Sequence, residues 1–145
     1  MSLLNYTTSV KSAKTIGEVT QLLIKGGARQ IMSEFDVNGE ATGITFSVAT
    51  PLGVRGFTLP VNAEPVRLIL QEDSNPSLRP SHRTPEHARN VAWRIIKDWL
   101  EAQLALIETE MVTFDQVMLP YMRSIDGGTF YESYIAGVGT KALNA

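Results

Sequence analysis

One long stretch, residues 84–110, carries the pattern of a single helix and limits what the rest of the chain can fold into. Thr84 is a favourable N-cap, Pro85 fits the first helical position, and Glu86 suits the positive end of the helix dipole. Behind them, apolar side chains recur at three- and four-residue steps in two adjacent rows, and only a narrow polar stripe is left. A helix this apolar needs cover from other elements or from a second subunit.

Residues 29–61 have a period of two and predict three antiparallel strands, over residues 29–36, 41–50 and 54–61. Asn38-Gly39 is typical of a two-residue type I′ hairpin turn, and residues 51–53 form a second turn. The second and third strands each present one apolar face. That buried face is predicted to consist of Ile44, Phe46, Val48, Phe57 and Leu59.

Shorter helices are predicted on both sides of these elements. Capping boxes begin them at Thr15, Thr113 and Thr129, and Asn62 caps another over residues 63–71, with Val66, Ile69 and Leu70 pointing inward. Residues 3–8 form a short candidate strand. Residues 72–84 hold two prolines and no periodicity, so we expect an exposed, mobile loop.

Together these patterns predict one α+β domain over residues 1–145. It consists of an antiparallel β-meander of three or more strands, packed against a long central helix and shorter N- and C-terminal helices. The second apolar row of the long helix, which includes Trp93, Leu100, Leu104 and Ile107, is left over once the first row is covered. We therefore expect a homodimer or a larger oligomer.

The charge is divided by segment. Basic residues outnumber acidic ones in residues 1–29 and 67–97, and the reverse holds in residues 30–66 and 98–145, for a net charge of −2. The chain has no cysteine, no apolar run long enough for a membrane span and no pattern of a signal peptide. We expect a cytoplasmic protein that does not contact a membrane.

The sequence does not favour an enzyme. His82 and His87 lie five residues apart, and no third ligand has a spacing that suggests a metal site. No Gly-x-Ser-x-Gly elbow is present, and Gly26-Gly27 lies at a helix end rather than in a phosphate-binding loop. We expect no catalytic residue, no metal and no cofactor.

The richest chemistry lies in residues 79–84, Arg-Pro-Ser-His-Arg-Thr, which lead into the long helix. A helix N-terminus presents free N–H groups, so arginines and hydroxyls beside it suit a phosphate group. A solvated loop with an N-cap explains the same residues and stays the competing interpretation. The candidate nucleic-acid or phosphate-binding residues are Arg79, His82, Arg83, Arg89, Arg94, Arg55 and Lys25.

The aromatic residues divide into two kinds. Trp93 and Trp99 lie within the apolar helix, which favours core positions over base-stacking platforms. Tyr131 and Tyr134 lie in a polar tail and are better candidates for exposed stacking or an interface.

The run AWRIIKDWLEAQLALIE at residues 92–108, followed by VMLPYM at residues 117–122, resembles a family of small proteins of bacteriophages, prophages and other mobile elements. The resemblance implies a bacterial host cell as the setting and brings no functional residues with it. Phage genomes are rich in small DNA-handling proteins and in proteins that neutralise host defence.

These observations leave three hypotheses. The first is a non-enzymatic nucleic-acid-binding protein, for single-stranded DNA, that uses the basic loop and helix N-terminus. The second is an oligomeric binder that sequesters a small phosphate-bearing nucleotide, as an anti-defence protein does. The third is a structural or assembly protein.

Overall fold

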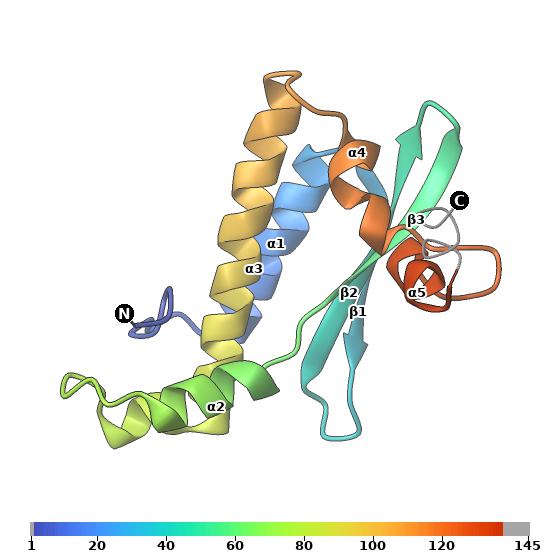
Figure 1. The fold of residues 1–145 in the computed structure, drawn as a ribbon. Helices are drawn as coiled ribbons and strands as arrows, with labels where there is room; N and C mark the ends of the chain where they lie inside the picture. The colour runs from blue at the N-terminus through green and yellow to red at the C-terminus, as the bar shows by residue number, and fades with distance from the viewer. Residues whose placement is uncertain (1, 138–145) are drawn as a thin grey trace. The chain divides into compact units, whose positions relative to one another are not determined.

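The computed structural model describes residues 2–137 and has an antiparallel three-stranded sheet and one long helix, so the α+β fold class is confirmed (Figure 1). The helices are α1 (Ser12–Lys25), α2 (Glu64–Glu72), η1 (Pro80–Arg83), α3 (Pro85–Glu108), α4 (Phe114–Met118), η2 (Leu119–Tyr121) and α5 (Phe130–Ile135). The strands are β1 (Ala28–Phe35), β2 (Ala41–Thr50) and β3 (Gly53–Pro60). Within residues 2–137, no helix combines the length and apolarity that crossing a lipid bilayer requires.

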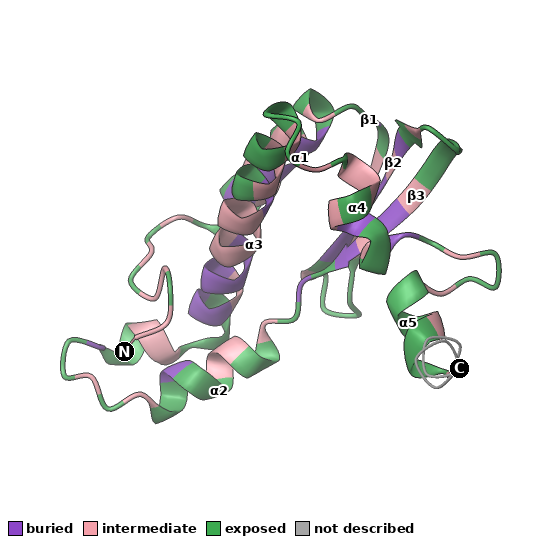
Figure 2. Ribbon diagram, turned by 45° about the horizontal axis from the view of Figure 1, so that its top comes forward, coloured by how far each residue is buried: buried purple, intermediate pink, exposed green. Residues whose placement is uncertain are grey.

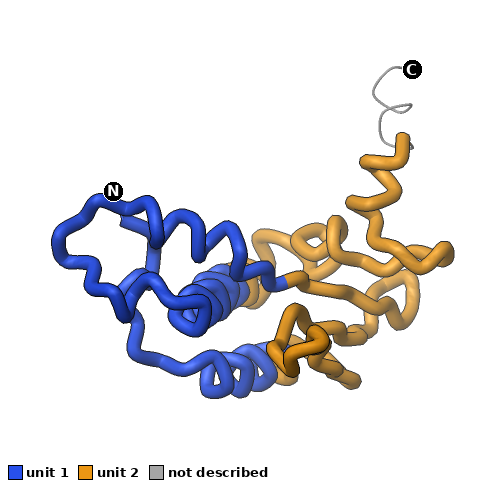
Figure 3. Tube along the Cα trace, turned by 90° about the horizontal axis from the view of Figure 1, so that it is seen from below, with its two compact units in different colours: residues 1–23, 61–102 blue, residues 24–60, 103–145 orange. Residues whose placement is uncertain are grey.

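The chain divides into two compact units (Figure 3). Unit 1 consists of Met1–Leu23 and Val61–Ala102, and unit 2 consists of Ile24–Pro60 and Gln103–Ala145. Unit 1 thus holds most of α1 and α3 together with α2 and η1, and unit 2 holds the sheet and the C-terminal helices. The single domain expected over residues 1–145 stays a prediction.

Unit 1 is organised around the first half of α3, which is its most buried helical segment (Figure 2). Thr84 caps α3 as predicted, because its Oγ1 accepts a hydrogen bond from the His87 N–H at 3.1 Å. Ala88 and Val91 pack with Leu70 of α2 and with Leu78. Leu78 lies in the segment that was expected to be an exposed loop, and its burial fixes that segment to the core.

Two further expectations about unit 1 are wrong. Residues 3–8 form turns instead of a strand, because Leu3 and Tyr6 pack on the helical core and Asn5 adopts the left-handed conformation, with φ of 65°. In α2, Leu70 is buried as expected, but Ile69 is 48% exposed.

Helix α1 begins at Ser12, three residues before the predicted start at Thr15. Thr15 does not cap this helix and is buried within it. The first turn is capped from α3 instead, where Asn90 Oδ1 accepts a hydrogen bond from the Ser12 N–H at 2.8 Å. A cap that comes from a residue far along the chain leaves no signal near the helix start.

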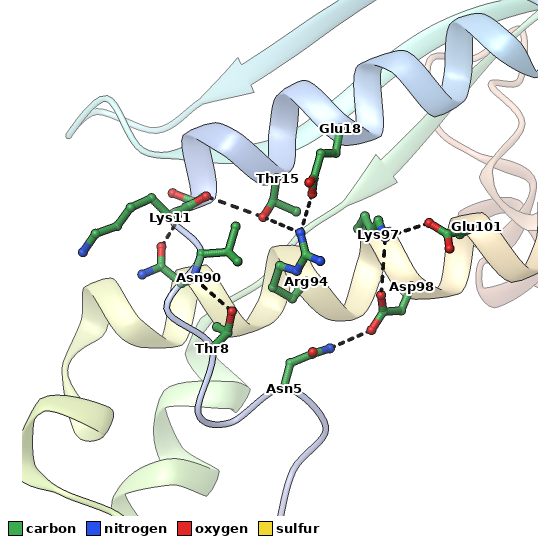
Figure 4. A network of polar contacts seen from close by, with 12 residues as sticks. Asn5, Thr8, Lys11, Thr15, Glu18, Asn90, Arg94, Lys97, Asp98 and Glu101 are labelled. Atoms are coloured by element: carbon green, nitrogen blue, oxygen red, sulfur yellow. Dashed lines mark hydrogen bonds and ion pairs between the residues drawn. The ribbon is translucent and has the colours of Figure 1, made fainter.

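Polar contacts join α1, α3 and the N-terminal turns of unit 1 (Figure 4). The Arg94 guanidinium donates to the carboxylate of Glu18 and, at 3.4 Å, to the hydroxyl of Thr15. Asn5 Nδ2 donates to Asp98 Oδ2 at 2.8 Å. Because these partners come from three separate stretches of chain, their side chains set how the stretches align.

In unit 2 the sheet order is β1-β2-β3, with both pairs antiparallel, as the meander prediction requires. Ile44 and Phe46 of β2 lie opposite Leu59 and Phe57 of β3, and all four side chains are buried. The predicted apolar face is therefore confirmed.

The first hairpin differs from the predicted type I′ turn, which requires positive φ at both central residues. Gly39 has φ of 78°, but Asn38 does not belong to the residues with positive φ. The Gly39 N–H donates to Asp36 O at 3.0 Å, and the Asp36 N–H donates to Glu40 O at 2.9 Å. The loop between this pair therefore has three residues, and the Asp36 carboxylate also accepts hydrogen bonds from the N–H groups of Asn38 and Glu40.

The C-terminal segment of unit 2 is built on the edge of β3. Met122 pairs with Phe57 in an antiparallel bridge, and the Arg123 N–H donates to Gly56 O at 2.8 Å. Both predicted capping boxes, at Thr113 and Thr129, are confirmed. The first of these helices ends early, as Pro120 predicts, since α4 stops at Met118 and passes into η2.

The apolar row predicted to remain open on α3 is covered in part. Trp93 and Leu100 are only 1% and 0% exposed, and Leu104 and Ile107 are half-buried. The expected large exposed patch is therefore wrong at its centre. The homodimer stays a prediction that this row no longer supports.

Helix α3 ends in a Schellman motif in which Glu110, rather than glycine, takes the left-handed position. The Met111 N–H donates to Leu106 O at 3.1 Å and the Glu110 N–H to Ile107 O at 3.0 Å. Glu110 has φ of 62°, a left-handed conformation that glycine adopts without strain.

Glu110→Gly should raise the free energy of unfolding by about 0.5–1 kcal/mol, because it relieves the left-handed strain. Glu108→Gly is the matched control, since it removes the same charge from a helical residue and should destabilise by about 1 kcal/mol. Chemical denaturation of both variants measures the difference. Equal effects of the two substitutions would contradict the strain at Glu110.

Candidate anion-binding site

The predicted basic residues fall into both units. Unit 1 contains Arg79, His82, Arg83, Arg89 and Arg94, whereas unit 2 contains Lys25 and Arg55. Neither unit holds the full predicted set. Each unit must therefore be judged as a separate place for an anion.

Two of the arginines in unit 1 have structural roles. The Arg83 guanidinium donates to the carbonyl oxygens of Leu70 and, at 3.2 Å, Gln71, so it satisfies the C-terminal end of α2. The Arg94 side chain is 16% exposed and is bound by Glu18. Arg89 is half-buried, and Arg79 is exposed at the start of η1.

His82 lies at the centre of the remaining basic cluster. Its Nδ1 accepts a hydrogen bond from the Arg79 N–H at 3.1 Å, and its ring lies 5.1 Å from the ring of His87. Partial desolvation lowers the pKa of His82 most, and His87, Arg79 and Arg83 lower it further. The cluster therefore has a positive potential, which an anion would offset.

His87 is fixed by a different contact. Its Nε2 lies 2.6 Å from the backbone oxygen of Tyr6, so Nε2 carries the hydrogen and donates. This bond attaches the N-terminal turns to α3. His87 is buried and acts as a structural residue in unit 1.

Unit 2 contains an open depression of about 770 Å³ on one side of α5. Two arginines, two serine hydroxyls and exposed apolar side chains line it. They are Arg55, Arg123, Ser124, Ser133, Ile125 and Phe130. Of the predicted residues, Arg55 lies here, and Lys25 does not belong to the lining.

Backbone bonds position the two arginines. Arg123 follows Met122, which pairs with Phe57. The Arg123 side chain lies over Gly56, and a Cβ atom added at Gly56 would lie 3.4 Å from Arg123 Cγ. The Arg123 side chain therefore packs directly against Gly56 of β3. Arg55 Nη1 donates to the backbone oxygen of Val54 at 3.1 Å, which holds the guanidinium near the strand.

One carboxylate also lines the depression. The Ser124 hydroxyl donates to the Asp126 side chain and lowers the pKa of that carboxyl group. The hydroxyl also lies 3.1 Å from Gly128 O, within the turn that leads to α5. A bound anion must therefore lie on the arginine side, away from Asp126.

Sequence reasoning missed Arg123. Its neighbours predict a turn, and it is an isolated basic residue in the acidic segment 98–137. Only the bridge between Met122 and Phe57 brings it beside Arg55. No pattern in the sequence near residue 123 indicates this bridge.

The aromatic predictions agree with the structure. Tyr131 and Tyr134 are 55% and 43% exposed, and their rings stack with centroids 6.4 Å apart. Trp93 is buried, as a core residue is, whereas Trp99 is half-buried. Over the described part of the chain, no group of three or more histidine, aspartate or glutamate side chains is arranged to hold a metal ion.

Acid should destabilise unit 1 through His82. Its folded-state pKa is lowered, so the neutral form stabilises the fold fully above the ordinary pKa of about 6.5, and this contribution is lost as the pH falls below it. His82→Asn keeps an acceptor for the Arg79 N–H but does not titrate.

Denaturation between about pH 7 and pH 5 should therefore show a steeper loss of stability in the native protein than in His82→Asn. Parallel pH profiles would show that the proton on His82 has no linkage to folding.

Comparisons of the chain with protein-family models, with curated proteins and with solved structures found no match. The side chains of the two units are therefore the basis for assigning a function.

Proposed function

We propose that this protein binds single-stranded nucleic acid without catalysing a reaction, through the depression lined by Arg55 and Arg123. The observation that carries the proposal is that two arginines and the exposed ring of Phe130 line the same open hollow. Proteins that bind single strands combine cationic side chains for the backbone with aromatic rings for the bases.

The side chains that line the depression can contact the phosphate groups and one base of a short stretch of nucleic acid. Each guanidinium offers a planar pair of N–H donors to phosphate oxygens, and the hydroxyl of Ser133 adds a shorter contact. Phe130 is 42% exposed, so one face of its ring is accessible to a base. Tyr134 is 43% exposed and follows Phe130 by four residues on α5, so it lies on the same side of that helix.

The surrounding charge limits the contact to a few phosphates. Taken together, residues 24–60 and 103–137 have more acidic than basic side chains, so the phosphate backbone is repelled elsewhere on unit 2. Two phosphate contacts predict that log K falls with log salt at a slope of about −1.4. In unit 1, Arg79 beside His82 offers a separate phosphate contact.

Fluorescence anisotropy with a labelled oligothymidine at low salt tests this proposal. Arg55→Gln with Arg123→Gln should weaken binding at least tenfold and flatten the salt dependence, because each lost charge-assisted contact costs about 1.5–3 kcal/mol. Phe130→Leu should weaken binding about tenfold without changing the salt slope.

Arg29→Gln is the matched control, since Arg29 is an exposed arginine of the same unit that does not line the depression. It should leave the affinity within about twofold of the native value. An equal loss from Arg29→Gln, or no binding by the native protein at low salt, would rule the proposal out.

A second candidate function is capture of a small phosphate-bearing nucleotide in the same depression. Its volume of about 770 Å³ favours this candidate, because small-molecule sites commonly fall between about 300 and 1,000 Å³. Both candidates fit a cytoplasmic protein in a bacterial host. The resemblance to phage proteins fits DNA handling under the first and neutralised host defence under the second.

Thermal shift with mono-, di- and cyclic nucleotides separates the two candidates. Under nucleotide capture, one ligand should raise the melting temperature in the native protein and not in the Arg55→Gln/Arg123→Gln variant. Stabilisation by oligothymidine alone would favour the first candidate. Stabilisation by no ligand would eliminate nucleotide capture.

A further inference from the structure

Unit 2 contains a second hollow, smaller and of different chemistry, on another face of α5. It has a volume of about 380 Å³, and two prolines, two tyrosines and polar side chains line it. These residues are Pro60, Pro120, Tyr121, Tyr131, Thr58 and Glu132. Tyr131 and Glu132 come directly after Phe130 on the helix, so they face away from the arginine-lined depression.

The hollow presents hydrogen-bond acceptors. Thr45 donates its hydroxyl hydrogen to Glu34 Oε1 at 2.6 Å, so in its 3.0 Å contact with Thr58 the hydrogen must come from Thr58. Thr58 Oγ1 can then only accept a hydrogen bond from a ligand. The row Glu34–Thr45–Thr58 therefore ends in the hollow as an acceptor.

Glu132 adds a fixed negative charge. Its Oε1 accepts from the N–H and the hydroxyl of Thr129 at 3.3 and 3.2 Å, which is the capping box of α5. These bonds use one carboxylate oxygen, and the described residues that line the hollow include no lysine, arginine or histidine. Acidic residues also predominate in residues 103–137, which include the hollow's α5 residues, so the local field favours a cation.

We infer that this hollow binds an organic cation, an ammonium or guanidinium group on an apolar stem. The charged head lies over the faces of Tyr121 and Tyr131, whose rings attract cations through their quadrupoles. Glu132 and Thr58 accept its N–H groups, and the stem packs on Pro60 and Pro120. The inference uses neither arginine of the depression, so it stands or falls independently of the proposed function.

Such a cation has two possible sources, a free alkyl cation or a lysine or arginine side chain of a partner peptide. The probes are pentylammonium, butylguanidinium and a short glycine peptide with one central lysine, titrated while NMR shifts of Tyr131 and Glu132 are followed. All three should cause saturable shifts, while the neutral isostere 1-pentanol should not. A peptide that binds more tightly than pentylammonium assigns the site to a partner protein, and equal affinities assign it to free cations.

Two variants test the roles of the side chains. Glu132→Gln retains the capping box but loses the charge, so affinity for butylguanidinium should fall about tenfold. Tyr131→Phe should bind as the native protein does, and Tyr131→Leu should bind several-fold more weakly. Because Tyr131 is 55% exposed, neither change perturbs the core.

Glu108→Gln is the matched control, an exposed glutamate of the same unit outside the hollow, and should not alter binding. The Arg55→Gln/Arg123→Gln variant should also bind the cations with native affinity. Absence of saturable shifts in the native protein, equal shifts with 1-pentanol, or unchanged affinity in Glu132→Gln and Tyr131→Leu would each overturn the inference.

Discussion

Unit 2 depends on the packing of Phe57. Its ring stacks on Phe46 of the neighbouring strand at 5.5 Å and meets the edge of Phe114 from α4 at 5.4 Å. The backbone of the same residue forms the bridge to Met122, so the aromatic cluster and the added strand segment share one anchor. Both hollows depend on this anchor. Arg123 lies beside Gly56 on one side, and η2 and α5 bring Tyr121 and Tyr131 to the other.

Much of the fold was predictable because its signals lie between close neighbours in the sequence. Alternation over residues 41–50 identified β2 together with its buried face, and the capping boxes at Thr113 and Thr129 identified the starts of α4 and α5. Thr84 marked α3 in the same way. Each capping side chain bonds three residues away from itself, and the alternation in β2 is also a pattern of near neighbours, so a linear sequence expresses both.

The candidate sites were less predictable because their members meet only in three dimensions. Arg83 and Arg94 resembled anion-binding residues in the sequence, yet their charges bind α2 carbonyl groups and Glu18. Arg123 gave no signal, although it lines a hollow with Arg55. The start of α1 shows the same effect in the fold, since its cap is supplied by Asn90. The sequence shows that a basic residue is present, but only the tertiary structure shows whether its side chain is already bound to another group of the protein.

The division into units has a consequence for how the protein is made. The chain passes between the units within α1, between residues 60 and 61, and within α3, so each unit joins two separate stretches of sequence. On the ribosome, the first 23 residues emerge well before residues 61–102, which complete their packing. The β-meander emerges in the interval, still without the Phe114 ring that covers Phe57. Neither unit can finish folding until α3 has been synthesised, so a nascent chain stalled before that point exposes the apolar surfaces of both.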